Sequence, residues 1–318
     1  MHSCLPKKPA IFYICIPVAT LLFALALPTA AADIELLLEP APTHCGKAAP
    51  AIGAVPPAAA QRLVGSQVVN GQRDIAWAWL GSPTARYPHA ALGSPTHAGR
   101  LQEVVYPLPL NRVFEDLTVR LVDMDQDGRD EVIVIESDAV RGASVVVLGL
   151  EDASDAPSGK KLVEKARSPA AGSTYRWLNF VGVADFDGDG KLDVAAVITP
   201  HIGGVLTLYH YRPPQLVPYA KALDTSNHLM GSPEQQLSVV LQQPGKRPTI
   251  IVPDMSLKAL HALRWEGTGV NGKFKELAEL IPLNARVERI TPLADAPGTA
   301  CVLLADGTSQ RVVLKDGL

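Results

Sequence analysis

One nine-residue pattern, which occurs twice, constrains the fold of this 318-residue chain more than any other feature. Segments 123–131 (Asp-Met-Asp-Gln-Asp-Gly-Arg-Asp-Glu) and 185–193 (Asp-Phe-Asp-Gly-Asp-Gly-Lys-Leu-Asp) carry acidic residues at positions 1, 3, 5 and 9, and glycine at position 6. Several carboxylates on a short loop offer hard oxygen ligands, and glycine allows a sharp turn. The pattern therefore predicts two cation-binding loops, and Ca²⁺ is the cation that best suits such ligands.

An EF-hand is the obvious alternative, and the sequence argues against it. An EF-hand loop ends in a bidentate Glu at position 12 and lies between two helices. Position 12 is Val134 in the first segment and Ala196 in the second, and the apolar runs at 132–135 and 194–198 are short and rich in β-branched residues. Such runs are typical of buried strands, so each loop is predicted to join two β-strands.

The ligands must then close around the ion by position 9. The alternative is a polar turn that binds no ion, but four like charges within nine residues repel one another when no cation is present. We predict two Ca²⁺ sites, with side-chain ligands Asp123, Asp125, Asp127 and Glu131 in one and Asp185, Asp187, Asp189 and Asp193 in the other, and with the carbonyls of Arg129 and Lys191 at position 7.

At these residues the chain resembles a known family. The pattern Asp-x-Asp-x-Asp-Gly-x-x-Asp/Glu between hydrophobic strands is similar to the FG-GAP/VCBS repeat, the blade unit of integrin-α-like β-propellers, and the resemblance covers roughly residues 73–318. It implies an all-β propeller with Ca²⁺ in the loops between the first two strands of some blades. It implies no single biochemical activity, because a fold does not determine function.

The rest of the chain fits a repeat of short strands. From residue 74 onward, apolar stretches alternate with Gly, Pro and Ser turns, and helical periodicity is almost absent. The acidic segments are 62 residues apart, which indicates one blade per roughly 50 to 60 residues. A third copy keeps its strands but not its acids: the corresponding residues are Val240, Gln242, Pro244 and Pro248.

A fourth copy follows at 287–314, also without an acidic loop. Residues 73–110 form a further unit, and a strand near 63–69 is expected to complete the last blade and close the ring. Closure removes the exposed sheet edges that an open array would leave. We predict a propeller of five blades over residues 61–318.

The N-terminal segment indicates export. Lys7 and Lys8, the apolar run at 10–27 and the small residues at 30–32 match the three regions of a secretory signal peptide, with Asp33 as the first mature residue. The apolar run approaches the length of a membrane span, so an uncleaved anchor is the alternative. We predict a signal peptide at 1–32, a Pro/Ala-rich tether at 33–60, no transmembrane span in the mature chain and a periplasmic or extracellular location.

Two cysteines remain after such cleavage, Cys45 in the tether and Cys301 in the last repeat. Oxidising compartments favour disulfides, so we predict a Cys45–Cys301 bond. Without residues 1–32, the chain has 27 basic and 32 acidic residues (29 − 2 against 32), a formal charge of −5. This balance gives no electrostatic support for nucleic-acid binding.

Three histidines are candidates for a ligand-binding face. His89, His201 and His228 lie in turn-like stretches at related points of their repeats, and turns at equivalent positions of a ring converge on one face. The alternative is that they only bond the local backbone. The four tryptophans lie in strand-like stretches that favour core positions over a sugar-binding role.

No nucleophile motif, zincin motif or phosphate-binding loop is present. The sequence therefore favours a Ca²⁺-stabilised binding or scaffolding module for a protein or glycan partner. A hydrolase or metalloenzyme with its site on the histidine face is the alternative.

Overall fold

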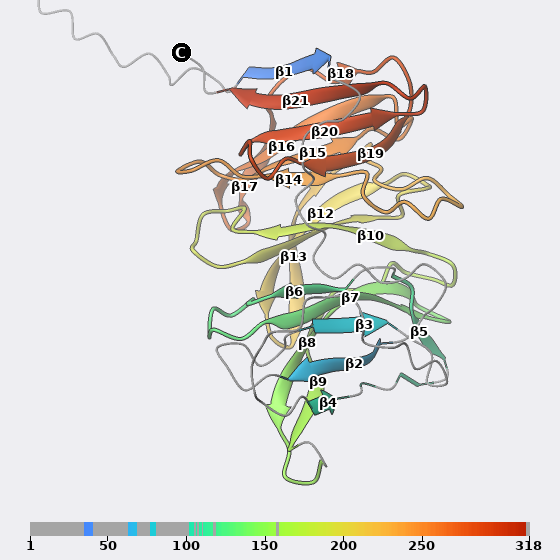
Figure 1. Cartoon of the computed structure of the whole chain (residues 1–318), viewed down its shortest axis with the longest axis vertical. Helices are drawn as coiled ribbons and strands as arrows, with labels where there is room; N and C mark the ends of the chain where they lie inside the picture. Colours follow the sequence, from blue (N-terminus) through green and yellow to red (C-terminus); the bar gives the residue numbers. More distant parts are fainter. Residues whose placement is uncertain are drawn as a thin grey trace, which may run out of the picture.

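The chain is described by a computed structural model over residues 35–40, 63–68, 77–80, 102–104, 106, 108–109, 111–116, 119–156 and 159–315. All regular structure in these residues is β-strand, as the sequence predicts, and no α-helix occurs among them (Figure 1). In this part of the chain, no helix is long and apolar enough to cross a membrane. The predicted signal peptide, Cys45 and His89 lie outside the described residues.

The strands occur in short antiparallel runs. Their bounds are β1 Glu35–Pro40, β2 Leu63–Val68, β3 Trp77–Leu80, β4 Gln102–Val104, β5 Arg112–Phe114, β6 Arg120–Val122, β7 Glu131–Asp138, β8 Gly142–Asp152, β9 Lys160–Arg167, β10 Leu178–Ala184, β11 Asp193–Ile198, β12 Val205–Arg212, β13 Gln215–Ala222, β14 Val239–Leu241, β15 Thr249–Pro253, β16 Ala259–Thr268, β17 Asn271–Glu276, β18 Ile281–Pro282, β19 Val287–Pro292, β20 Thr299–Leu304 and β21 Ser309–Lys315.

One unit, an antiparallel run of four strands, recurs along the chain. The first three copies are β6–β9, β10–β13 and β14–β17, in each of which consecutive strands pair. β5 and β18 add short strands to the first and third copies, by pairing with β7 and β16. The first two copies are joined by one parallel pair, Gln215 with Arg167.

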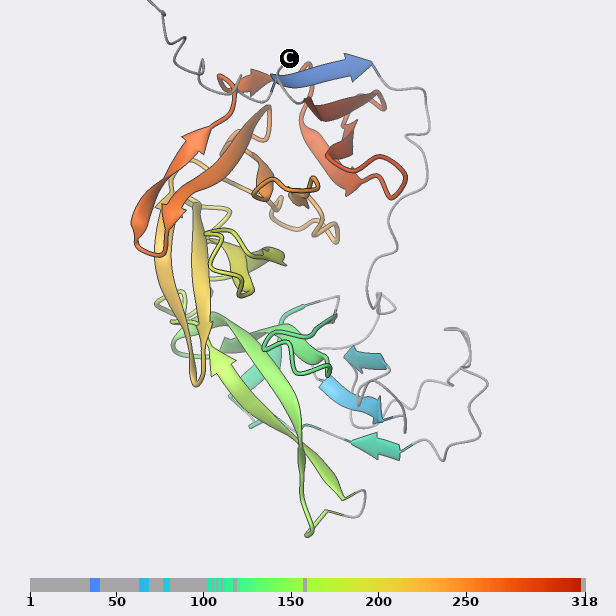
Figure 2. The same ribbon diagram turned by 90° about the vertical axis from the view of Figure 1, so that its left-hand side faces the viewer.

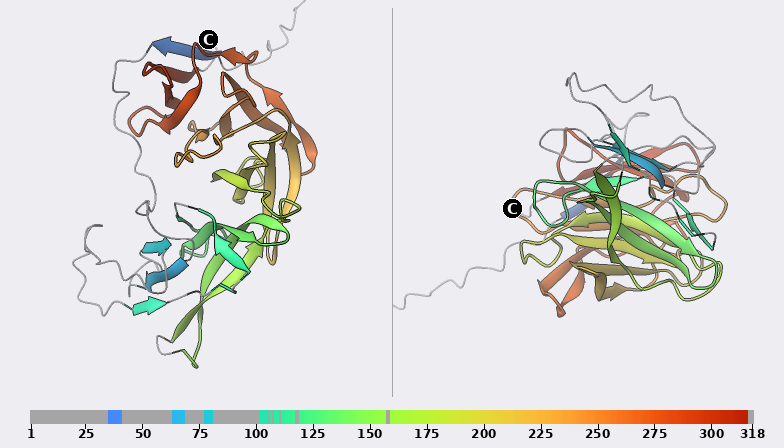
Figure 3. Two further views of the ribbon diagram at one scale, coloured as in Figure 1. Left: turned by 90° about the vertical axis from the view of Figure 1, so that its right-hand side faces the viewer. Right: turned by 90° about the horizontal axis from the view of Figure 1, so that it is seen from below.

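The repeated units follow one another along an arc. Figures 2 and 3 show β19–β21 at one end, then β14–β17 and β10–β13, and then β6–β9 with β2–β4 beside them. The first strands of the last three units lie side by side, since β10 contacts β14 and β14 contacts β19, and β10 also contacts β7 and β8 of the first unit. The sheets therefore stack face to face.

This stacking explains why the middle strands are apolar on both faces. In β7, Val132 and Val134 face one hydrophobic layer while Ile133 and Ile135 face the next. In β11, Val194 is buried in the second of these layers. Ala195 is buried in a third layer, to which β15 also contributes. A strand has side chains on alternate faces, so each central strand is buried between two neighbouring sheets.

The strand that completes the last sheet differs from the prediction. The fourth strand beside β19–β21 is β1, which pairs antiparallel with β21 from Glu35–Lys315 to Pro40–Gln310. The predicted strand near 63–69 is present as β2, but it pairs with β3 and β4 in a separate three-stranded sheet. The reason is that residues 35–40, with Leu-Leu-Leu between two acids, have weak β-propensity, so that their role depends on the free edge of β21.

Candidate functional site

The two acidic segments occupy equivalent positions. We call 123–131, between β6 and β7, loop A and 185–193, between β10 and β11, loop B. The backbone at positions 4 and 6 has positive φ in both: 62° at Gln126 and 90° at Gly128, and 73° at Gly188 and 85° at Gly190. Position 2 anchors each loop, since Met124 and Phe186 are buried in the layers between sheets. Burying a side chain of this size stabilises the loop by about 2–3 kcal/mol.

In loop A, three of the predicted ligands come together. Carboxylate oxygens of Asp123, Asp125 and Glu131 all lie within 4.8 Å of one another. Both Asp123 oxygens accept backbone N–H bonds, from Asp127 at 3.0 Å and Gly128 at 2.9 Å, and Glu131 Oε2 accepts one from Met124 N at 2.9 Å. The strand–loop–strand geometry thus gathers positions 1, 3 and 9.

Position 5 of loop A contacts an arginine, and its role as a Ca²⁺ ligand stays a prediction. Asp127 Oδ2 accepts bonds from Arg129 Nε at 2.9 Å and Nη2 at 2.6 Å, and Asp127 is not part of the three-carboxylate group. Two guanidinium N–H groups converge on this one carboxylate oxygen and hold Asp127 beside Arg129 at an exposed position. The carbonyl of Arg129 as a ligand stays a prediction.

Loop B gathers the same three positions. Oxygens of Asp185, Asp187 and Asp193 lie within 4.8 Å of one another, while Asp189 Oδ1 accepts the backbone N–H of Lys191 at 2.8 Å. Asp187 and Asp193 are both almost fully buried. The carbonyl of Lys191 as a ligand also stays a prediction.

Loop B has neighbours that the sequence pattern did not reveal. Tyr219 donates its hydroxyl proton to Asp193 Oδ2 at 2.8 Å, and His210 Nδ1 lies 3.1 Å from Asp193 Oδ1. Gly269, in the β16–β17 turn of the next sheet, donates its N–H to Asp187 Oδ2 at 2.5 Å. Loop B is therefore held by its own sheet and by the next one. The only sequence signal for these neighbours is the period-2 spacing that places His210 and Tyr219 on strands.

The carboxylates carry an electrostatic cost. Burial raises the pKa of Glu131 to about 7, with a further contribution from Asp125, Asp127 and Asp123. Burial also raises the pKa of Asp193 to about 6; the hydrogen bonds from Tyr219 and His210 oppose this rise, and the charge of Asp187 adds to it. A cation among these groups would relieve both effects, since an opposite charge favours the ionised form.

The histidine candidates lie at the other edge of the sheets. Loop B precedes β11, whereas His201 follows it, and β11 spans roughly 20 Å. His201 Nε2 lies 2.7 Å from Nδ1 of His228, which belongs to the segment between β13 and β14. The structure therefore brings these two candidates into direct contact.

Several buried groups hold the segment that carries His228. Ser226 donates its hydroxyl to Pro200 O at 2.7 Å. Asn227 Nδ2 donates to Phe180 O at 3.1 Å, and Asn179 Nδ2 donates to Asn227 O at 3.0 Å. Both asparagines are completely buried. Sequence analysis missed these residues, because isolated Asn and Ser residues resemble ordinary turn residues.

Trp177 covers the histidine pair. Its ring stacks on His201 with centroids 5.9 Å apart and an interplanar angle of 15°, and it meets His228 edge-on at 4.7 Å. Trp177 is partly buried against the layer between the first two repeats, and Trp265 is in the core of the next layer. Both side chains thus have packing roles, as the sequence suggests.

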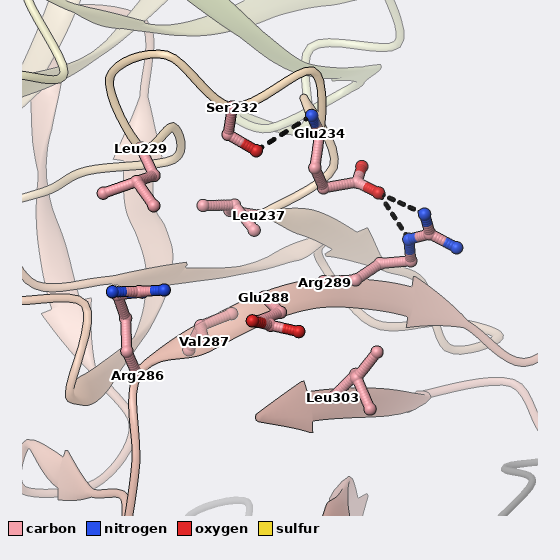
Figure 4. A pocket seen from close by; sticks show the side chains of 9 residues that line it. All are labelled: Leu229, Ser232, Glu234, Leu237, Arg286, Val287, Glu288, Arg289 and Leu303. Carbon is pink, nitrogen blue, oxygen red and sulfur yellow. Dashed lines mark hydrogen bonds and ion pairs between the residues drawn. The ribbon is translucent and has the colours of Figure 1, made fainter. Parts of the chain in front are cut away.

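A cavity of about 300 Å³ lies beside this segment, near the starts of β14 and β19 (Figure 4). Its lining combines apolar and charged side chains from the last two repeats. They are Leu229, Ser232, Glu234 and Leu237 from the first segment and Arg286, Val287, Glu288, Arg289 and Leu303 from the second.

The two arginines of the cavity differ. Arg289 is committed to an ion pair with Glu234 at 2.5 Å. The Nε of Arg286 is buried and has no hydrogen-bond partner among the residues that the structure describes. Figure 4 shows its guanidinium on the opposite side of the cavity from the Glu234–Arg289 pair. The sequence had no signal for this residue.

Cys301 lies in β20 and is disulfide-bonded. It is opposite Arg311 of β21, which is in turn opposite Glu39 of β1. Cys45 follows Pro40 by five residues, a span of up to about 17 Å. The pairing with Cys45 stays a prediction, because the partner cysteine lies outside the described residues.

Comparison with known proteins gives no family. No family model matches the chain, and no curated protein matches it. Among solved structures, the chain is similar to one titled "Crystal structure of BBS1N in complex with ARL6DN, soaked with lead". The identity is 12%, the TM-score is 0.33, and the match covers 68% of this chain and 69% of that chain. A likeness this distant carries no inference about function.

Proposed function

We propose that this chain is an exported, Ca²⁺-stabilised β-propeller of five blades that binds a protein partner. The recurrence of four-stranded units, their face-to-face stacking along an arc and the completion of the last sheet by β1 support the propeller. The three-stranded sheet β2–β4 would be the fifth blade. An N-terminal strand that pairs with the C-terminal unit is the kind of closure that a ring of sheets needs.

Calcium is proposed for both loops. Each loop offers three carboxylates, at the same three positions, whose oxygens lie within 4.8 Å of one another. Both loops also have positive φ at positions 4 and 6. The loops also touch, since Gln126 Nε2 donates to Gly190 O at 3.1 Å. Oxygen ligands at this density suit Ca²⁺, and the ion would act by stabilising the folded state.

The proposed binding site for the partner is the cavity near the starts of β14 and β19. It is a concave site lined by apolar and charged side chains, and the buried Nε of Arg286 has no hydrogen-bond partner among the described residues. A guanidinium pairs best with a carboxylate or phosphate. The cavity therefore favours a ligand that brings its own anion to Arg286.

A protein segment fits this cavity better than a glycan does. Leu229, Leu237 and Leu303 supply apolar contacts, and none of the lining residues is aromatic, as a stacking platform for sugars would be. The ligand class that matches is a carboxylate beside an apolar side chain, as at a peptide C-terminus. Glycan binding is the competing outcome of the test.

The test compares ligand selection by wild type and by a variant. Peptides displayed with free C-termini are selected on the purified mature protein in Ca²⁺, and the affinities of enriched peptides are measured for Arg286→Met. Loss of the charge-assisted pair should weaken binding at least tenfold.

Arg289→Met is the matched control, because it removes an equal charge from the same cavity but one already paired with Glu234. Its effect should be smaller than that of Arg286→Met. Enriched peptides that bind both variants as tightly as wild type, or selective binding on a glycan array without peptide enrichment, would contradict the proposal.

The alternative, a hydrolase or metalloenzyme, has one observation in its favour, the contact between His201 and His228. Within the described part of the chain, neither ring is hydrogen-bonded to a Ser, Thr or Cys side chain, as a nucleophile and its base would be. The pair is therefore more relevant to metal binding than to acyl transfer.

A further inference from the structure

We propose that His201 and His228 form a two-histidine site for a divalent transition metal of the Zn²⁺ and Cu²⁺ class. The two rings come from segments 27 residues apart, and their Nε2 and Nδ1 atoms face each other at 2.7 Å. Imidazole nitrogens are preferred ligands of these ions. The site is separate from loops A and B, which lie at the other end of the strands.

The tautomer of His228 follows from its second contact. Its Nε2 lies 2.9 Å from the carbonyl oxygen of Ser232, which can only accept, so Nε2 carries the proton. In the neutral ring, Nδ1 then has a free lone pair, and that lone pair points at His201. Metal-binding histidines are commonly held in this way, with the other ring N–H donated to a backbone carbonyl.

His201 can present a lone pair to the same point. Its Nδ1 has no hydrogen-bond partner in the described part of the chain, so the ring proton can reside there and leave Nε2 free. Burial lowers the pKa of both imidazoles, which favours the neutral, ligating form at neutral pH. The two rings need no rearrangement of the backbone to share an ion.

The geometry requires a small movement of the side chains. Two bonds of about 2.0–2.1 Å at a tetrahedral angle place the nitrogens about 3.3 Å apart. The rings must therefore separate by roughly half an ångström, which a partly exposed His201 allows. Water would occupy the remaining positions, so the ion would stay accessible to an exogenous ligand.

His261 is a histidine that has no ring nitrogen available to bind a metal ion. Its Nδ1 lies 2.6 Å from Glu276 Oε1, and its Nε2 lies 3.1 Å from the carbonyl of Asp224. Both ring nitrogens are thus committed. His261→Gln is the matched control for the substitutions at the pair.

The experiment uses the mature chain without a histidine tag, in excess Ca²⁺ so that acidic loops are occupied. Calorimetry with Zn²⁺ and fluorescence with Cu²⁺ are recorded, because Trp177 touches both rings and should be quenched by bound Cu²⁺. We expect His201→Gln and His228→Gln each to weaken binding at least tenfold and His261→Gln to leave it unchanged.

Trp177→Phe should remove most of the Cu²⁺ quenching while calorimetric Zn²⁺ binding persists. If His228→Gln does not fold, the half-buried His201→Gln variant decides the result, with its melting curve as the check on folding. Equal Zn²⁺ binding by wild type and His201→Gln would show that the pair is only a hydrogen bond. Such a result would leave the other two proposals intact. The cavity test depends on Arg286, and the calcium test depends on loops A and B.

Discussion

At the scale of single residues, the four acidic positions of each loop, which look equivalent in the sequence, differ in their structural setting. Asp193 lies in the three-carboxylate group, and Asp189 does not. We expect Asp193→Asn to remove the share of loop B in the Ca²⁺-dependent stabilisation, about 2.7 kcal/mol for a Kd near 10 µM in 1 mM Ca²⁺. Asp189→Asn should keep most of it. Denaturant unfolding with and without chelator measures both, and equal losses, or a wild type indifferent to chelator, would contradict the assignment.

His261 gives a second prediction at this scale. The hydrogen bond that its Nδ1–H donates to the Glu276 carboxylate raises the pKa of His261 above the ordinary value near 6.5, although burial opposes the rise. The charged ring is therefore favoured in the folded state, and its contribution to stability is complete below about pH 6.5 and lost as the pH rises through the folded pKa. The stability gap between wild type and His261→Gln should shrink from pH 6 to pH 8. A gap that widens with pH would contradict this assignment.

At the scale of elements, a glutamine side chain ties each of two loops to the backbone of the next sheet. Gln126 in loop A donates to Gly190 O, and Gln243 in the third, acid-free loop donates to Leu314 O at 3.0 Å. Both glutamines stand two residues before the turn glycine, at 128 and 245. We expect Gln243→Ala to lower the free energy of unfolding by about 1–1.5 kcal/mol, and the exposed Gln126→Ala by less. The Ca²⁺ response of Gln243→Ala should match wild type, and its loss would mean that the third loop binds an ion.

At the scale of the whole molecule, β1 decides whether the last sheet has a free edge. Deleting residues 33–40 should expose β21 and cause self-association, because an unpaired edge strand is a template for further pairing. A synthetic peptide with the β1 sequence should restore a monomer with the wild-type melting temperature, and a scrambled peptide should not. Light scattering and melting curves record the result, and a stable, monomeric truncation would show that β1 is dispensable.

The sequence by itself determined the features that depend on local chemistry. Short apolar runs rich in β-branched residues identified the central strands, and the acid and glycine positions identified loops A and B with their sharp turns, because both signals lie within about ten consecutive residues. Only the tertiary structure decided the pairing of β1 with β21, the contact of His201 with His228 and the cavity at Arg286. All three depend on how elements far apart in the sequence pack against one another. No local pattern encodes these outcomes, since each is set by which groups remain unpaired once the sheets have packed.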